Sequence, residues 1–168
     1  IKDGKKIPIV GNGRNRYQLL DVDDLVEAIY KAITINDKRK VNDSFNIGAG
    51  KFETVERDLQ KLFDFAKSGS RILKTPAWPI KKTLFILEKL NLSPLYKWIY
   101  ETADKDSFVS ISKIKKALNW RPKYSNSQAL IKSYKWYLKN YKEIKKGALG
   151  VTHTVGWKQG ILGIFKRL

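Results

Sequence analysis

The sequence predicts a mixed α/β fold that is mainly helical and has a few short strands. Apolar residues recur at helical spacing over several long stretches. Strand-like runs, in contrast, are short and stand beside glycine turns. A chain of 168 residues, 42% of them hydrophobic, is long enough for one domain with its own core. We therefore expect a single globular α/β unit rather than a disordered or repetitive chain.

The expected strands lie mostly in the first half of the chain. Residues 7–10 form one strand, 11–15 a turn, and 17–22 a second strand of the same pair. The run SFNIGAG at 44–50 predicts a short strand that ends in a glycine turn. A further strand is expected at 71–74, before the prolines at 76 and 79.

The first two expected helices follow these runs. Asp23 is predicted to cap a helix that runs to about Ile35. Thr54 is predicted to cap a second helix, which Gly69 ends. The apolar residues of the first helix share one face: Val22, Val26, Ile29, Tyr30 and Ile33.

The second half of the chain is expected to be almost entirely helical. Two apolar pieces occupy 80–102 and separate near Pro94. A short helix starts at position 110 or 112 and ends before the loop NWRPKY. A longer helix covers about 127–141, where Ser125 and Gln128 have the spacing of a capping box.

The string IVGNGRNRYQLL raises the question of a dinucleotide-binding turn. Such a turn needs three glycines and a helix that starts at once, because the helix N-terminus holds the phosphates. Gly11 and Gly13 have the required spacing, but Arg16 occupies the third glycine position and a strand-like run follows. The pair Gly48 and Gly50 is followed by KFE and a later helix start. We predict a glycine turn between strands and no cofactor-binding fingerprint in this chain.

Composition limits the classes of partner. Lys and Arg number 34 against 16 acidic residues, a net charge of +18, which favours anionic partners. A solvated basic surface explains the same excess equally well. The absence of cysteine excludes disulfides and thiolate metal sites, and His153 is the single histidine, so no metal is expected. No apolar run approaches the ~20 residues of a membrane span and no signal peptide is present, so a cytoplasmic location is predicted.

Three motifs, taken in order, resemble those of the NAD-dependent epimerase/dehydratase family of extended short-chain dehydrogenases/reductases. A glycine turn, an Arg, a strand and V-x-D lie within 11–24. The (Y/F)-N-(I/V)-G string is FNIG at 45–48, and S-K-x-x-x-x-L-G-W-x-P corresponds to 112–122. The resemblance extends over nearly everything up to about Tyr141 and corresponds to the C-terminal, substrate-binding half of the family.

The resemblance implies an enzyme in which an upstream Rossmann half holds NAD or NADP and the catalytic Tyr-x-x-x-Lys. Only Tyr141 and Lys145 have that spacing here, beyond the place where the family carries its motif, so no catalytic residue is expected in this chain. The chain has no Met and opens on IKDGKKIPIV, which predicts that it is part of something larger. Apolar surface that meets the missing half should then be exposed.

The same resemblance implies which residues bind substrate. Arg16, with Arg14 as the second candidate, takes the place of the Arg that grips a substrate diphosphate, although Arg16 lies one residue early when counted from Asp24. The family's R-P-G-D string is replaced by ADKDSF, so Lys105 is the substitute cation. Asn46 lies at the end of the expected FNIG strand, and substrate binding is the less favoured of its two interpretations, after contacts with backbone groups near the site. Asp23 and Asp24 are interpreted as helix-capping residues, and Trp120 and Pro122 as core and turn.

Alternatives remain open from the sequence alone. The favoured reading is residues 1–146 as the substrate-binding portion, with a nucleotide-sugar or another small-molecule substrate and a homodimer as partners. A basic module for nucleic acid or another anionic surface is the alternative, supported by the Lys- and aromatic-rich run SYKWYLKNYKEIKK. The tail 147–168 is undecided and is the one segment for which a membrane interface is considered.

Overall fold

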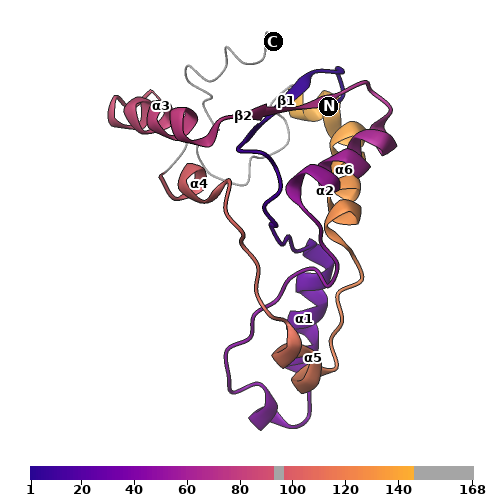
Figure 1. Cartoon of the computed structure of the whole chain (residues 1–168). Coiled ribbons are helices and arrows are strands. Elements are labelled where there is room, and N and C mark those ends of the chain that lie inside the picture. Colours follow the sequence, from indigo (N-terminus) through magenta and orange to yellow (C-terminus); the bar gives the residue numbers. More distant parts are fainter. Residues whose placement is uncertain (93–96, 146–168) are drawn as a thin grey trace.

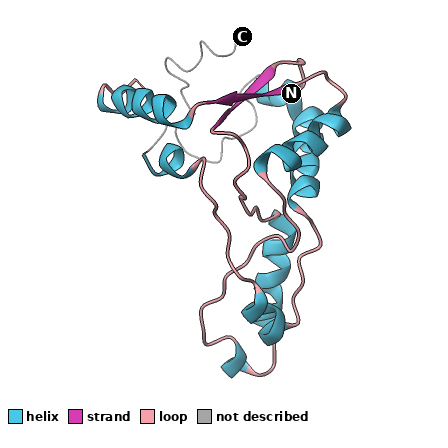
Figure 2. Ribbon diagram, viewed as in Figure 1, coloured by secondary structure: helices cyan, strands magenta, loops and turns pink. Residues whose placement is uncertain are grey.

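The computed structural model describes residues 1–92 and 97–145. Figure 1 shows an elongated molecule with a two-stranded sheet near one end and a helical arm at the other. Figure 2 shows that helices and long connecting loops account for most of it. The described elements are β1 (Lys6–Val10), α1 (Val22–Thr34), the 3-10 turn η1 (Lys38–Lys40), α2 (Val55–Ala66), β2 (Arg71–Thr75), α3 (Ala77–Lys89), α4 (Lys97–Thr102), α5 (Ser112–Leu118) and α6 (Asn126–Lys145).

The predicted fold class is confirmed, as are several predicted local signals. Thr54 caps α2 by accepting a hydrogen bond from the backbone N–H of Arg57. The Ser125–Gln128 capping box precedes α6, since each residue's side chain accepts from the other's backbone N–H. Predictions made for Pro94, for His153 and for the tail at 147–168 lie outside the described residues.

The predicted pairing of 7–10 with 17–22 is wrong. β1 instead pairs in parallel with β2, with Lys6 opposite Arg71 and Val10 opposite Thr75. The predicted strand at 17–22 is absent because its backbone is bound otherwise: the Asn126 side chain accepts from Leu19 N–H and donates to Tyr17 C=O. Within 17–22, the described structure has a single isolated bridge, between Tyr17 and Ser107.

The predicted strand at 44–50 is also wrong. Residues 44–49 have no assigned secondary structure, although Phe45 and Ile47 pack against a buried cluster and Ser44 and Asn46 are exposed. This alternation is that of a strand, yet no neighbouring strand lies beside it in the part of the chain that the structure describes. Ala49 N–H donates to Leu19 C=O, whereas residues 44–48 have the side-chain pattern of a strand without a paired strand in the described structure.

The main buried cluster joins the helical arm to the loop that follows α5. It consists of Ala28 on α1, Ile111, Ile114 and Leu118 on and beside α5, and Trp120, which is fully buried. A second contact region lies where α2 packs against α6 and β2, with Leu62 and Phe63 buried on α2. The third unit pairs α3 with α4 around Leu84 and Tyr100.

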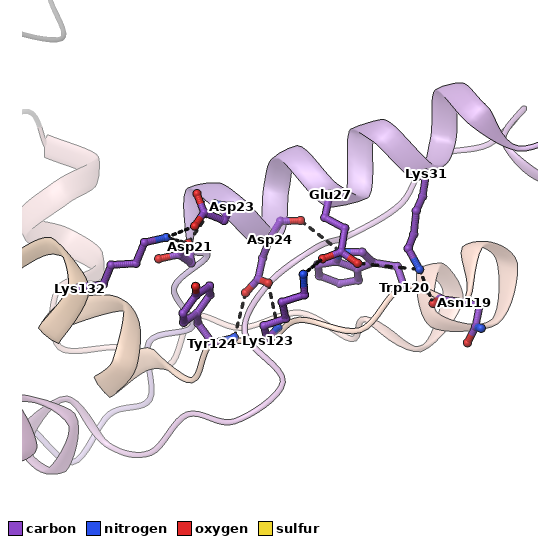
Figure 3. Close-up of polar contacts among 10 residues, drawn as sticks. All are labelled: Asp21, Asp23, Asp24, Glu27, Lys31, Asn119, Trp120, Lys123, Tyr124 and Lys132. Atoms are coloured by element: carbon purple, nitrogen blue, oxygen red, sulfur yellow. Dashed lines mark hydrogen bonds and ion pairs between the residues drawn. The ribbon is translucent and has the colours of Figure 1, made fainter.

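The acidic start of α1 fixes the loop at 119–124 (Figure 3). The Asp24 carboxylate, 1% exposed, accepts the backbone N–H groups of Lys123 (2.8 Å) and Tyr124 (3.1 Å), and the Trp120 indole donates to Asp24 C=O. Asp21, not Asp23, is the N-cap of α1. The interpretation of Asp24 as a capping residue is therefore corrected, because its carboxylate serves the loop, whereas Trp120 is core as predicted.

The side chains of two lysines and a glutamate complete this network. Lys132 on α6 pairs with both Asp21 and Asp23, and these two carboxylates raise the pKa of its ammonium group. Lys123 pairs with Glu27 at 2.7 Å, and this contact lowers the pKa of the Glu27 carboxyl group. Ion pairs therefore join the start of α1 to α6 and its Glu27 to the loop at 119–124.

The outer face of α1 is exposed, even though it carries the apolar residues predicted to share one face. Their exposed fractions run from 50% for Ile29 to 67% for Ile33. Apolar side chains at this spacing normally face a core. The helix is therefore anchored by one face and leaves the more apolar one without a partner in the described structure; the exposed residues are Val22, Val26, Ile29, Tyr30 and Ile33.

No helix among the described residues is both long and apolar enough to cross a membrane. The described segments also bring no group of three His, Cys, Asp or Glu side chains together in a way that could hold a metal ion.

Candidate functional site

The glycine turn after β1 is a packing device. Gly13 has φ +73°, and a Cβ there would lie 2.7 Å from the Ile9 side chain and 3.1 Å from that of Glu56. Its carbonyl accepts the N–H of Glu56 at the start of α2, and the next helix along the chain begins only at Val22. This geometry does not fit a dinucleotide phosphate, which needs a helix that starts directly at the glycines.

Two loops that are far apart in the sequence lie side by side at this turn. Asn15 donates from its amide to the carbonyls of Ala103 and Lys105. Arg16 N–H donates to the Asp106 carboxylate at 2.7 Å, and Ser107 N–H donates to Arg16 C=O. The segments 12–18 and 103–109 are therefore held together by backbone and buried-amide contacts, a placement that no local pattern in the sequence indicated.

Gln18 ties a third segment to these loops. Its side-chain amide donates to Ala49 C=O and accepts from Val109 N–H, each at 2.8 Å. Glycine at position 48 leaves room for this contact, because a Cβ there would lie 2.5 Å from the end of the Gln18 side chain. The glycine that ends the FNIG string is therefore the position at which the Gln18 side chain packs against the backbone.

Arg16 lies on an aromatic platform made by two of these loops. Its guanidinium carbon is 4.7 Å from the centre of the Phe52 ring and 5.0 Å from that of Phe108, and the two rings are 5.6 Å apart. Cation–π contacts of this kind restrain the planar group while leaving its N–H donors free for another ligand. Arg16 is exposed and has no side-chain ion pair or hydrogen bond within the described residues.

The platform borders a cleft of about 380 Å³. Lys51 and Lys61 supply further cations to its lining, while Glu53 and Asp58 supply acids, and Glu53 pairs with Lys61 at 2.6 Å. Ser125 and Ser127 add hydroxyl groups. The cleft therefore combines charged and hydroxyl-bearing lining residues with the guanidinium of Arg16.

An apolar cavity of about 390 Å³ lies on the other side of Asp58. Asp58 is 4% exposed, and its carboxylate accepts from Glu53 N–H and from the Asn126 side chain. Because Asp58 lines both spaces, the polar cleft and the apolar cavity share a wall. The cavity is otherwise lined by Tyr17, Leu19, Val55, Leu59, Trp98, Ile99, Thr102, Ala103, Asn126 and Leu130.

Tyr100 supports the α4 side of the cavity from behind. Its hydroxyl donates to Glu88 on α3, and burial together with this hydrogen bond raises the pKa of the phenol to about 12. The hydroxyl consequently remains a neutral donor across the ordinary pH range. Tyr100 therefore joins α4 to α3 and so helps to place Trp98 and Ile99 at the cavity.

The other predicted site residues are placed differently. Arg14 lines a separate cleft at the start of α2, with Glu56 and Arg57. Lys105 is exposed in the loop beside Arg16, so the structure brings those two segments together. Asn46 is exposed between Phe45 and Ile47, which pack against the other buried cluster, and it does not line the Arg16 cleft.

Three features of the site were missed from the sequence. Asp58 had a recognisable signal, since it falls on the apolar face of its helix with Val55, Leu59 and Leu62. Phe52 and Phe108 had none, because their contact with Arg16 depends on three separate loops. Tyr141, the one residue with Tyr-x-x-x-Lys spacing, contacts the Lys2 ammonium and the Tyr137 ring and lines neither the cleft nor the cavity.

Comparison with known proteins places these features in context. Residues 1–48 match the NAD dependent epimerase/dehydratase family. An uncharacterized protein of Sinorhizobium fredii is 35% identical over 164 residues, which are 98% of this chain and 40% of that protein. A dTDP-glucose 4,6-dehydratase of Haemophilus influenzae is 29% identical over 143 residues, 82% of this chain and 37% of that protein.

Solved structures give the same fold. UDP-glucose 4-epimerase of Thermotoga maritima, solved with UDP-glucose, matches with a TM-score of 0.59 at 23% identity, over 83% of this chain and 37% of that one. The chain thus spans about two fifths of the length of the curated relatives it matches. The resemblance deduced from the ordered motifs is confirmed: the chain is similar in sequence to the NAD-dependent epimerase/dehydratase family and has the fold of part of an extended short-chain dehydrogenase/reductase.

Proposed function

We propose that this chain is the substrate-binding portion of an NAD(P)-dependent nucleotide-sugar epimerase, dehydratase or related reductase. In this proposal the catalytic and cofactor motifs lie upstream, and NAD or NADP is held there. The observation that carries the proposal is the guanidinium of Arg16, free of carboxylate partners in the described structure and restrained by Phe52 and Phe108 at the edge of a cleft.

The chemistry of this cleft supports a phosphate-bearing substrate. A guanidinium offers paired N–H donors that match phosphate oxygens, and prior restraint of the group lowers the entropy lost on binding. Lys105 stands in the adjacent loop, in place of the second Arg that the family resemblance leads one to expect. Arg16 therefore carries the main anion contact, and Lys105 adds a point charge.

The proposal is tested by titrating the chain with dTDP-glucose and with UDP-glucose, using calorimetry, and with free glucose as the control ligand. Arg16→Ala should weaken binding of the nucleotide-sugars by about 10- to 100-fold, because charge-assisted hydrogen bonds contribute roughly 1.5–3 kcal/mol. Arg14→Ala is the matched control, since it removes the same group from a neighbouring cleft. Equal losses for the two variants would contradict the assignment of Arg16.

The exposed face of α1 supports an upstream half. Burying five large apolar side chains that are now 50–67% exposed contributes on the order of 1–2 kcal/mol each. No charged side chain interrupts this stripe, as expected of a surface made for protein. Relatives more than twice as long as the matched region supply a length of chain that could provide the partner.

The unpaired strand-like segment at 44–48 supports the same partner. Its Phe45 and Ile47 pack against the cluster that includes Ala28 of α1, so segment and helix belong to one layer. An extended backbone without a neighbouring strand is a template for one more strand. We therefore propose that a sheet edge of the upstream half pairs with 44–48 while the adjoining face of that sheet covers α1.

This part of the proposal is tested on the reading frame before Ile1. It should encode a G-x-x-G-x-x-G strand–turn–helix and a Tyr-x-x-x-Lys, and the two parts produced together should bind NAD or NADP where the 168-residue chain does not. An upstream frame without these motifs refutes the proposed arrangement. A cytoplasmic location and a homodimer belong to the same proposal and are tested by fractionation and by light scattering of the assembled protein.

A further inference from the structure

Helix α3 presents an exposed apolar face that also carries lysines, unlike the exposed face of α1. Trp78 is 71% exposed, Ile86 49% and, at the C-cap of α3, Leu90 60%. Figure 1 shows α3 and α4 beyond the end of the two-stranded sheet and away from α1 and α5. Large apolar side chains gathered in this way on a soluble fold mark an interaction surface.

Cations are interleaved with these apolar side chains. The Lys82 ammonium lies 5.1 Å from the centre of the Trp78 ring, and that of Lys89 lies 5.7 Å from the centre of Phe85. Trp78, Lys82, Phe85, Ile86 and Lys89 follow the spacing of one helical face. Aromatic rings beside flexible ammonium groups are the combination that places rings in the acyl boundary of a bilayer and charges among its phosphates.

Two acids of the unit formed by α3 and α4, Glu88 and Asp104, are paired within it. Glu88, the one acid of α3, accepts hydrogen bonds from the Tyr100 hydroxyl and from Lys97 N–H. Asp104 pairs with Lys81, whose ammonium also donates to Glu101 C=O. Because these contacts lock the inner faces of α3 and α4 together, the exposed face of α3 carries Lys and no Asp or Glu.

We propose that the exposed face of α3 docks on an anionic phospholipid bilayer. Charge complementarity favours this occupant, since an apolar protein surface that covered Trp78 and Phe85 would also have to desolvate Lys82 and Lys89. A bilayer containing acidic headgroups instead accepts the rings and leaves the ammonium groups at the hydrated phosphates. The proposal is independent of the nucleotide-sugar assignment, since it uses none of the residues of the Arg16 cleft.

The test is co-sedimentation of the 168-residue chain with vesicles of phosphatidylcholine alone or with phosphatidylserine as about one third of the lipid. We expect binding only to the acidic vesicles. Lys82→Gln with Lys89→Gln should weaken the partition coefficient by about 25-fold, since each Lys near an anionic surface contributes about fivefold. Lys139→Gln with Lys142→Gln makes the same charge change on α6 and should alter it by less than about threefold.

Two further variants separate this face from other apolar segments. Trp78→Ala should lower partitioning at least about tenfold, because apolar burial is lost. Ile29→Asp, which changes the exposed face of α1, should leave it unchanged. The proposal is overturned if the acidic vesicles are not bound, if both lysine pairs have equal effects, or if Ile29→Asp or removal of 147–168 abolishes binding while the tryptophan variant retains it. Near-ultraviolet circular dichroism confirms that each variant is folded.

Discussion

Helices α1 and α3 each leave one face exposed, and the two faces have the same geometry but different chemistry. At positions i, i+4, i+7, i+8 and i+11, α1 carries Val, Val, Ile, Tyr and Ile, beginning at Val22. At the same spacing α3 carries Trp, Lys, Phe, Ile and Lys, beginning at Trp78. An uninterrupted apolar stripe fits a protein surface, whereas a stripe with ammonium groups between aromatic rings fits a lipid surface. The exposure of an apolar stripe therefore does not identify its partner, whereas the presence or absence of charged residues within the stripe does.

The largest expected effect is on the free energy of unfolding and compares a buried tryptophan beside α1 with an exposed tryptophan on α3. Trp120 is fully buried behind α1 and donates to Asp24 C=O, whereas Trp78 is 71% exposed on α3. Trp120→Ala should lower the free energy of unfolding by about 3–5 kcal/mol through cavity formation. Trp78→Ala should change it by less than about 0.5 kcal/mol. Urea denaturation of both variants, followed by circular dichroism, measures the difference.

A large loss of stability in Trp78→Ala would mean that the α3 face is part of the fold rather than an interaction surface. Such a result would contradict the comparison of α1 and α3 as two helices that each leave one face free for a partner.

The second prediction places a carboxylate on each exposed face in turn and asks which partner is lost. Ile29 and Phe85 occupy the same position, i+7, on their helices. Ile29→Asp should weaken association with the upstream half at least about 100-fold, because a carboxylate would be buried in an apolar interface. Phe85→Asp should leave that association unchanged and should weaken binding to acidic vesicles. Surface plasmon resonance against the separately produced upstream half measures the first effect.

If Phe85→Asp weakened association with the upstream half as much as Ile29→Asp, both faces would meet protein. The assignment of α3 to lipid would then be wrong.

The smallest expected effect concerns the anchored side of α1. The Glu27 carboxyl group receives the Lys123 ammonium, which lowers its pKa in the folded state. A carboxyl whose folded pKa lies below its unfolded value stabilises the fold above the unfolded pKa, and this contribution is lost as pH falls through the folded value. Glu27→Gln should therefore lower the urea midpoint slightly at neutral pH and reduce its decline between about pH 5 and about pH 3.

Lys123→Gln removes the same contact from the other side and should give the same change in the pH profile. Different profiles for the two variants would show that another carboxyl group controls acid unfolding.

Local sequence signals predicted local structure well. The caps at Thr54 and at Ser125 with Gln128 formed as expected, because the atoms involved lie within four residues of one another. The strands at 17–22 and 44–50 were predicted wrongly, because a strand needs a neighbour, and a sequence window does not contain one. Asn126 supplies contacts to Tyr17 and Leu19 that a strand partner would otherwise have made.

The candidate site was predictable only in part for the same reason. Arg16 followed from a motif, but its placement on Phe52 and Phe108 depends on backbone contacts between loops about 90 residues apart. Asn46 was a minor candidate for substrate binding because it lies near the end of the expected FNIG strand. In the structure its neighbours Phe45 and Ile47 pack against the α1–α5 cluster.

The most direct test of the account is hydrogen–deuterium exchange of the 168-residue chain, alone and bound to the proposed upstream half. We predict that exchange slows most at 44–48, whose amides gain a strand partner, and next in α1, whose apolar face is covered. Amides of α3 should exchange at the same rate in both states, because the proposal assigns its exposed face to lipid and not to the upstream half. Unchanged exchange in α1 and 44–48, or protection of α3 in their place, would contradict the account.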